Sequence, residues 1–174
     1  MSARGSAIVL IGFMGSGKTS VGRELAGRTG WPIYETDEMV AAQVGRSIDE
    51  IFERRGEAFF RAAETEALRA VPFERAIVVT GGGMVLRAEN IERLRLLGTV
   101  VQLAADGETL CARLAGETTR PLLRTDNPRQ TLSEMWRLRE PLYRAAADLV
   151  VDTSGLCARE VAEEILRRIE HGRA

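Results

Sequence analysis

The chain has 174 residues, of which 45% are hydrophobic and 28% charged, and its 24 basic residues nearly balance its 25 acidic ones. This composition is typical of one globular domain over residues 1–174, and the even charge argues against a nucleic-acid partner. Because no apolar run approaches the roughly 18 residues of a membrane span, we expect a cytoplasmic protein without a membrane partner. The single histidine, His171, argues against Ser-His-Asp catalysis and multi-histidine metal sites.

Five short apolar runs alternate with helical patterns along the chain. The runs that we expect to form strands are residues 7–11, 32–37, 76–80, 99–103 and 148–152. Helices are expected over about residues 18–30, 47–55, 56–71, 88–97, 107–114 and 131–147, and from residue 156 onward. Since the strands are continuously apolar, they predict a five-stranded parallel sheet with helices on both faces, which is a three-layer α/β fold.

Local signals add detail to this pattern. Ser47 and Glu50 have the spacing of a capping box that opens a helix, and Pro141 is expected to bend the helix that contains it. Residues 115–130 show no apolar periodicity and are expected to form a lid. Cys111 and Cys157 lack the spacing of metal ligands, and we expect both to be buried apolar groups.

The segment GFMGSGKT at residues 12–19 matches the pattern GxxxxGK[ST] between a predicted strand and a predicted helix. Glycines let backbone N–H groups surround phosphate oxygens, and the start of the following helix adds a favourable dipole. In this pattern Lys18 reaches the β- and γ-phosphates, and the hydroxyl of Thr19 binds Mg²⁺. Lys18 is the only lysine in the chain, which favours a need for a compact ammonium at this position. The sequence therefore predicts a nucleoside triphosphate site.

Two further segments lie near predicted strand ends, where α/β proteins bind ligands. Glu35 and Asp37 are two positions apart on a predicted strand, so both carboxylates would point to one face. One of them could serve the metal, and the other could hold an acceptor hydroxyl and take its proton. Residues 81–83 are three glycines that offer backbone amides. From local sequence alone, a solvated acidic turn and a simple loop remain alternatives for these segments.

The strand before the three glycines lacks the acidic residue that motor NTPases usually carry at that place, which favours a small-molecule kinase. Arg61 and Arg139 are, by local sequence, more typical of surface charges. Arg120, in the predicted lid, could close over the phosphates as an arginine finger supplied by the same chain.

These residues resemble the shikimate kinase family, within the P-loop nucleoside monophosphate kinase-like fold. The similarity covers nearly the whole chain and rests on GFMGSGKTSVGRELA, GRSIDEIFERRGEAFFRAAE, VVTGGG, TRPLL, REPLYR and VDTS. It implies a kinase that uses ATP and Mg²⁺ to phosphorylate the 3-hydroxyl of shikimate in aromatic amino-acid (chorismate) biosynthesis. It also implies the sheet order 2-3-1-4-5.

The motif and the resemblance together assign roles to individual positions. Catalytic roles fall on Asp37, Lys18 and Arg120. Substrate binding falls on Asp37, Arg61, Gly81, Gly82, Gly83 and Arg139. Nucleotide binding falls on Gly15, Ser16, Gly17, Lys18, Thr19, Ser20, Arg113, Arg120 and Leu156, and metal binding on Thr19 and Glu35. Residues 38–71 would form the acceptor-binding helical region. We expect a monomer, because the chain lacks a symmetric hydrophobic stripe.

One position departs from the family pattern. Members usually carry Asp-x-Asp after the second strand, whereas this chain has Glu35-Thr36-Asp37. The extra methylene moves a carboxylate that would reach Mg²⁺ through water, so we expect activity to survive with an altered metal affinity.

Two other hypotheses for the function remain. One is a kinase for another small polyhydroxy acid such as gluconate, which the paired arginines would also suit. The other is a non-catalytic ligand-sensing module.

Overall fold

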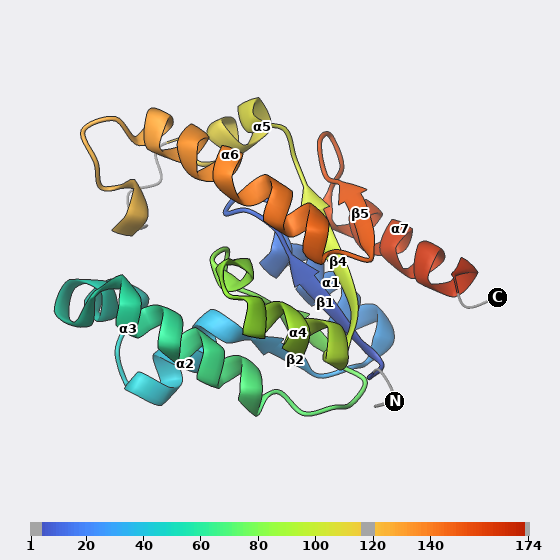
Figure 1. Ribbon diagram of the computed structural model, residues 1–174. Coiled ribbons are helices and arrows are strands. Elements are labelled where there is room, and N and C mark those ends of the chain that lie inside the picture. Colours follow the sequence, from blue (N-terminus) through green and yellow to red (C-terminus); the bar gives the residue numbers. More distant parts are fainter. Residues whose placement is uncertain (1–4, 116–120, 173–174) are drawn as a thin grey trace.

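A computed structural model describes residues 5–115 and 121–172 of the chain (Figure 1). These residues form a five-stranded sheet in the order β2-β3-β1-β4-β5, with every neighbouring pair parallel. The strands are β1 (Ala7–Ile11), β2 (Ile33–Glu35), β3 (Ile77–Val79), β4 (Gly98–Ala104) and β5 (Leu149–Asp152). The predicted parallel sheet and its strand order are therefore confirmed.

Helices cover both faces of this sheet, as Figure 1 shows. One face carries α1 (Lys18–Thr29) and α7 (Ala158–His171), and the other carries α4 (Ala88–Leu97) and α6 (Pro128–Ala146). In β1, Ile8 and Leu10 belong to the core on the side of α1, whereas Val9 and Ile11 belong to the opposite core. Because successive strand side chains point to opposite faces, a strand buried on both must be apolar throughout.

The other helical elements are α2 (Thr36–Val44), α3 (Ile48–Ala70), α5 (Gly107–Arg113) and the short 3-10 turns η1 (Met84–Leu86) and η2 (Pro121–Leu123). Of these, α3, α5 and η1 contribute residues to the same core as α4 and α6. A small core of Val40, Ile51, Phe60 and Ala67 joins α2 to α3. The predicted capping box of Ser47 and Glu50 is present at the start of α3. The predicted division near residue 56 is also present, because Gly56 has a non-helical φ of 77° inside α3.

The predicted course of the second strand was wrong. β2 ends at Glu35 and α2 begins at Thr36, so Glu35 and Asp37 do not lie on one strand. Thr36 is fully buried, and its hydroxyl oxygen accepts a hydrogen bond from the backbone N–H of Gly81 at 3.0 Å. This long-range contact fixes the first turn of α2 against the glycine turn at the end of β3.

Two helices begin at other residues than predicted. α6 starts at Pro128 instead of residue 131, because the side chain of Asn127 caps it by accepting from the N–H of Gln130 at 3.2 Å. The helix is unbroken through Pro141. α7 starts at Ala158 instead of residue 156.

The prediction of two buried cysteines was also wrong. Cys157 is exposed and is the N-cap residue of α7. Cys111 is half-buried on α5, where it lines a surface groove together with Trp136 of α6. Neither residue fills a core position.

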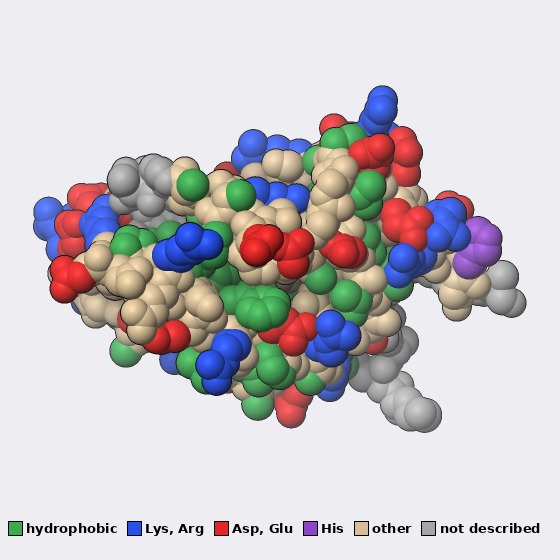
Figure 2. All heavy atoms as spheres, turned by 90° about the horizontal axis from the view of Figure 1, so that it is seen from above, with side chains coloured by type: hydrophobic (Ala, Val, Ile, Leu, Met, Phe, Trp, Pro, Cys, Tyr) green, Lys and Arg blue, Asp and Glu red, His purple; other side chains and the backbone are tan. Residues whose placement is uncertain are grey.

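The surface mixes both signs of charge. Figure 2 shows acidic and basic side chains interspersed over the face seen from above, so the charge balance of the sequence is also a local balance on this face. Among the helices of the described residues, none combines the length and the apolar character that a membrane span requires.

Two glycines in α1 have opposite surroundings. A Cβ on Gly22 would lie 2.4 Å from Cγ2 of Val79, whereas a Cβ on Gly27 would meet no atom within 4 Å. We therefore expect Gly27→Ala to raise the free energy of unfolding by about 0.5–1 kcal/mol, since alanine favours the helix. Gly22→Ala should lower it by about 1–3 kcal/mol, because the added methyl overpacks the contact with β3. Urea denaturation of the two variants checks this prediction, and shifts of the same sign would contradict it.

Candidate active site

The P-loop connects the buried end of β1 to the first turn of α1. All three of its glycines have positive φ: Gly12 at 149°, Gly15 at 79° and Gly17 at 90°. Residues other than glycine rarely adopt a positive φ, and this backbone conformation lets the loop curl around a phosphate. The ammonium Nζ of Lys18 donates to the carbonyls of Gly12 at 2.8 Å and Phe13 at 2.9 Å. The only lysine therefore lies across the glycine-rich loop.

A cavity of about 360 Å³ opens beside the P-loop. Of the predicted nucleotide-binding residues, it is lined by Gly15, Gly17, Lys18, Thr19, Ser20 and Arg113. Ser16 belongs to the same loop but is buried, and Leu156 is exposed and does not line this cavity. Arg120 lies outside the described residues, as do residues 116–119 of the predicted lid.

Arg113 joins the P-loop to the loop that follows β5. Its Nη1 donates to the carbonyl of Gly15 at 3.2 Å and to the hydroxyl of Thr153 at 3.1 Å, and its Nη2 donates to the carbonyl of Thr153 at 2.9 Å. The hydroxyl of Thr153 donates in turn to the carbonyl of Ala104 at 3.0 Å. An arginine held on two loops in this way is positioned to contact a nucleotide bound between them.

Thr19 and Glu35 form a hydroxyl–carboxylate pair at the same cavity. Oγ1 of Thr19 donates to Oε2 of Glu35 at 3.2 Å, and Nη2 of Arg23 lies 3.4 Å from Oε1 of Glu35. Mg²⁺ beside a nucleotide takes only one or two protein oxygens and completes its shell with water and phosphate oxygens. The longer side chain of glutamate thus reaches Thr19, and the pair suits Mg²⁺.

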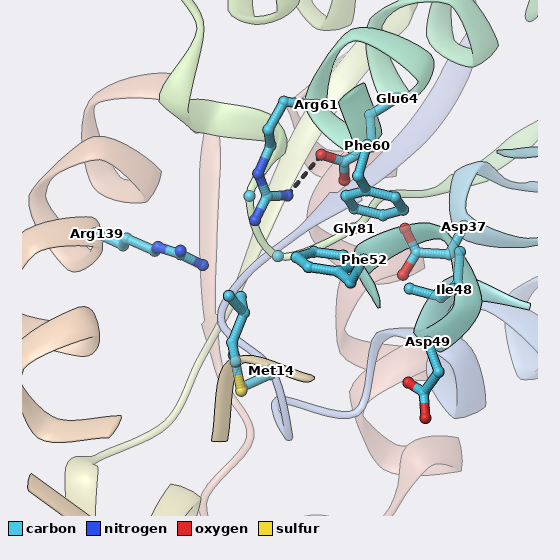
Figure 3. A pocket seen from close by; sticks show the side chains of 13 residues that line it. Met14, Asp37, Ile48, Asp49, Phe52, Phe60, Arg61, Glu64, Gly81 and Arg139 are labelled. Atoms are coloured by element: carbon cyan, nitrogen blue, oxygen red, sulfur yellow. Dashed lines mark hydrogen bonds and ion pairs between the residues drawn. The ribbon is translucent and has the colours of Figure 1, made fainter. Parts of the chain in front are cut away.

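A second cavity, of about 240 Å³, lies between α3, α6 and the glycine turn (Figure 3). Arg61 of α3 and Arg139 of α6 point into it, and they are only 9% and 7% exposed. Its apolar lining consists of Met14, Ile48, Phe52, Phe60 and Leu122. Two buried guanidinium groups between apolar walls have the chemistry to bind a small anion.

Arg61 is fixed by two carboxylates of its own helix. Its Nη1 lies 2.6 Å from Oε2 of Glu64, and its Nη2 lies 2.9 Å from Oε1 of Glu57. Glu64 is fully buried, and burial raises its pKa to about 7 although the guanidinium of Arg61 opposes this shift. These ion pairs hold the guanidinium in one position, so it is preorganised for a ligand.

The glycine turn is fixed from the side of α6. The hydroxyl of Tyr143 donates a hydrogen bond to the carbonyl of Gly82. Burial raises the pKa of Tyr143 to about 12, so the phenol stays protonated and remains a donor at neutral pH. This bond ties the turn to the helix that carries Arg139.

Several residues of the second cavity were not predicted from the sequence. Glu64 follows Arg61 by three positions, a spacing that places two side chains on one face of a helix, so a signal for it existed. Phe52 and Phe60, whose rings lie 4.8 Å apart, resemble ordinary core residues in the sequence. Nothing local distinguishes an aromatic residue that lines a cavity from one that fills a core.

The two cavities share four lining residues, Met14, Asp37, Gly81 and Gly82. Asp37, in the first turn of α2, therefore stands where the cavity of the P-loop meets the cavity of the two arginines. A phosphoryl group held by the P-loop and a hydroxyl held in the smaller cavity would meet beside this carboxylate. This arrangement suits phosphoryl transfer between two bound ligands.

The glycine turn also provides a matched pair of variants. A Cβ on Gly83 would lie 2.0 Å from Nη1 of Arg61, whereas a Cβ on Gly82 would have its nearest neighbour at 3.5 Å. We expect Gly83→Ala to displace the guanidinium and to lower kcat/KM for the acceptor on the order of 100-fold. Gly82→Ala should change it by less than about threefold. Steady-state kinetics with varied acceptor measures both, and similar losses would contradict the close approach of Arg61 to residue 83.

A glycine-rich phosphate loop at the end of the central strand of a parallel sheet, beside a second cavity with two arginines, defines a P-loop kinase of the nucleoside monophosphate kinase-like fold. Comparison with known proteins narrows this class. The chain belongs to the shikimate kinase family, whose model, described as shikimate kinase, matches residues 14–170.

Individual relatives agree with the family match. A shikimate kinase from Thermodesulfovibrio yellowstonii is 43% identical over 164 residues, which are 94% of each chain. One from Moorella thermoacetica is 48% identical over 159 residues, 91% of each chain. The solved structure of a shikimate kinase from Acinetobacter baumannii in complex with shikimate is 36% identical, with a TM-score of 0.91, and covers 98% of this chain and 96% of that one. The predicted family, fold and enzyme class are thus confirmed.

Proposed function

We propose that this chain transfers the γ-phosphoryl group of ATP to the 3-hydroxyl of shikimate and forms shikimate 3-phosphate in aromatic amino-acid (chorismate) biosynthesis. The observation that carries this proposal is the junction of the two cavities at Asp37. One cavity has the P-loop of a nucleotide site, and the other has two buried arginines for a carboxylate.

On the nucleotide side, Lys18 would hold the β- and γ-phosphates, and the backbone of residues 15–17 would surround them. Arg113 would contact the nucleotide from the side of the β5 loop, near Leu156. Thr19 and Glu35 would hold Mg²⁺, which would neutralise charge on the phosphate oxygens. Arg120 would close over the phosphates from the lid.

On the acceptor side, Arg61 and Arg139 would bind the carboxylate of shikimate, since a planar guanidinium can donate two parallel hydrogen bonds to it. The amides of residues 81–83 and the carboxylate of Asp37 would hold the ring hydroxyls. Asp37 would then orient the reacting hydroxyl and take its proton. The apolar walls around the junction favour transfer to the acceptor over transfer to water.

We also propose that the monomer is the active form. Of the candidate residues in the described part of the chain, all except Ser16 and Leu156 line one or both cavities, so the two cavities are formed without a second subunit.

The test is ADP release from Mg-ATP in the presence of shikimate, gluconate or no acceptor. We expect release that depends on shikimate, with one phosphorylated product per ADP. Release that depends on gluconate alone would favour a kinase for another polyhydroxy acid. Shikimate binding without any ADP release would favour a ligand-sensing module.

A further inference from the structure

Glu64 is an unusual group in the wall of the acceptor cavity. Its side chain has no exposed surface, and one oxygen, Oε2, pairs with Nη1 of Arg61 at 2.6 Å. The other oxygen, Oε1, is buried without a hydrogen-bond partner in the described part of the chain. A buried carboxylate with one unsatisfied oxygen is costly when it is charged.

A second carboxylate lies beside that oxygen. A Cβ on Gly81 would lie 2.3 Å from Oε1 of Glu64 and 2.5 Å from Oδ1 of Asp37, so these two oxygens are no more than about 5 Å apart. Figure 3 shows both carboxylates on the same side of the cavity. Glu64 is fully buried whereas Asp37 is exposed, so the nearby charge of Asp37 adds to the effect of burial on Glu64, and Glu64 is the carboxylate that tends to hold a proton.

The charged and titratable groups around Glu64 come from three helices. They are Arg61 and Glu57 on α3, Asp37 on α2, and Arg139 and Tyr143 on α6. Burial is the largest influence and raises the pKa of Glu64 to about 7, with Asp37 acting in the same direction and the two arginines against it. In the free cavity Glu64 is therefore poised between its two protonation states near neutral pH.

An acceptor carboxylate would disturb this balance. On the proposed function, the carboxylate of shikimate binds Arg61 and Arg139, which are the two groups that stabilise the charged form of Glu64. The bound anion shares their hydrogen bonds and adds a negative charge to the cavity. Both effects favour the protonated form of Glu64.

We propose that Glu64 is a positioning residue that takes up a proton from solvent when the anionic acceptor binds, and so adapts the charge of the cavity to a carboxylate. The uptake converts the carboxylate of Glu64 to a neutral carboxyl, and no other group need change. Loss of the negative charge of Glu64 removes the repulsion between its unpaired oxygen and Asp37 and weakens the pair of Glu64 with Nη1 of Arg61, so Nη1 is released toward the acceptor while Nη2 stays paired with Glu57. This inference rests on the proposed function.

The sign of the pH dependence follows from linkage. Binding that takes up a proton is favoured at low pH and weakens as pH rises above the pKa of Glu64 in the free cavity. The dissociation constant of shikimate should therefore increase by about tenfold per pH unit above pH 7, until the pKa of Glu64 in the complex is passed. Below about pH 6.5 it should be nearly constant, because Glu64 is already protonated in the free protein.

The experiment is calorimetric titration of the full chain with shikimate, without nucleotide, at pH 7.5 in HEPES and in Tris buffer. These buffers differ in ionisation enthalpy, so the difference between the two binding enthalpies counts the protons taken up. We expect about half a proton or more per shikimate for the wild-type chain. Glu64→Gln, which resembles the protonated carboxyl, should take up none and should bind with an affinity that hardly varies between pH 6.5 and 8.5.

Glu57→Gln is the matched control. Glu57 also pairs with Arg61, at 2.9 Å, but its side chain is 47% exposed. This variant should keep the proton uptake of the wild type. Should Glu64→Gln fail to fold, an infrared difference spectrum of the wild-type chain, with shikimate minus without, should show a new C=O stretch of a protonated carboxyl.

The possible results separate the inference from the proposed function. Tight shikimate binding without proton uptake, or uptake that persists in Glu64→Gln, would overturn the role of Glu64 and leave the kinase activity untouched. Absence of shikimate binding by a chain that still binds ATP would instead contradict the proposed acceptor, and the inference with it.

Discussion

Replacement of Lys18 by methionine is expected to lower kcat for phosphoryl transfer by about 100- to 1000-fold. The ammonium lies across the P-loop, within hydrogen-bond distance of the carbonyls of Gly12 and Phe13, and is only 9% exposed. On the proposed function, it would stabilise the negative charge of the transferring γ-phosphoryl group. Methionine fills a similar volume without charge, so the loss reports on electrostatics more than on packing.

Lys18→Arg tests the need for lysine more directly, because all the remaining basic Lys/Arg positions of this chain are arginine. A guanidinium is wider than an ammonium and presents its donors in a plane. A single nitrogen of Lys18 reaches both loop carbonyls, which a planar guanidinium cannot reproduce at one point, so we expect Lys18→Arg to lose nearly as much activity as Lys18→Met. Circular dichroism controls for folding. An arginine variant with wild-type kcat would show that the position requires only a positive charge.

The success of the P-loop prediction has a local cause. Its glycines, lysine and threonine lie within eight residues, so their spacing alone determines the geometry of the loop. The sheet was predictable for a related reason, since strands buried on both faces are apolar throughout and need no partner to be recognised.

The end of β2 could not be predicted in this way. The polar residues after Tyr34 fit a short strand as well as a helix start, and the bond that decides between them joins Thr36 to Gly81, which is 45 residues away. The residues around Thr36 do not indicate that contact. The expected placement of Asp37 beside Glu35 on a strand failed for this reason, although both residues line the cavity of the P-loop.

The two arginines of the acceptor cavity show the same limit. Local sequence made Arg61 and Arg139 look like surface charges, and only the resemblance to a family suggested otherwise. Both are buried, and Arg61 can be buried because Glu57 and Glu64 compensate its charge. The ion-pair partners of Arg61 could be predicted from helix spacing. The burial of Arg61 could not, because the cavity forms only when α3 and α6 pack in the tertiary structure.

Replacement of Asp37 by asparagine is expected to lower kcat by about 10²- to 10⁴-fold, with a smaller change in KM for shikimate. Asparagine keeps the size of the side chain and one hydrogen-bond acceptor, but it cannot take the proton of the reacting hydroxyl. Steady-state kinetics with varied shikimate separates kcat from KM. A loss confined to KM would contradict the role of Asp37 as the base.

Asp49→Asn is the matched control for Asp37→Asn, since Asp49 lines the same cavity but pairs with Arg124 at 2.5 Å at the surface. Its kcat should stay within about threefold of the wild type.

Asp37→Asn should also lower the pKa of Glu64, because removal of the charge at position 37 takes away one influence that raises this pKa. Glu64 would then ionise at lower pH in the free cavity, and the weakening of shikimate binding with rising pH should begin earlier than in the wild type. The two carboxylates are thus separable: kcat reports on Asp37, and the pH at which binding weakens reports on Glu64.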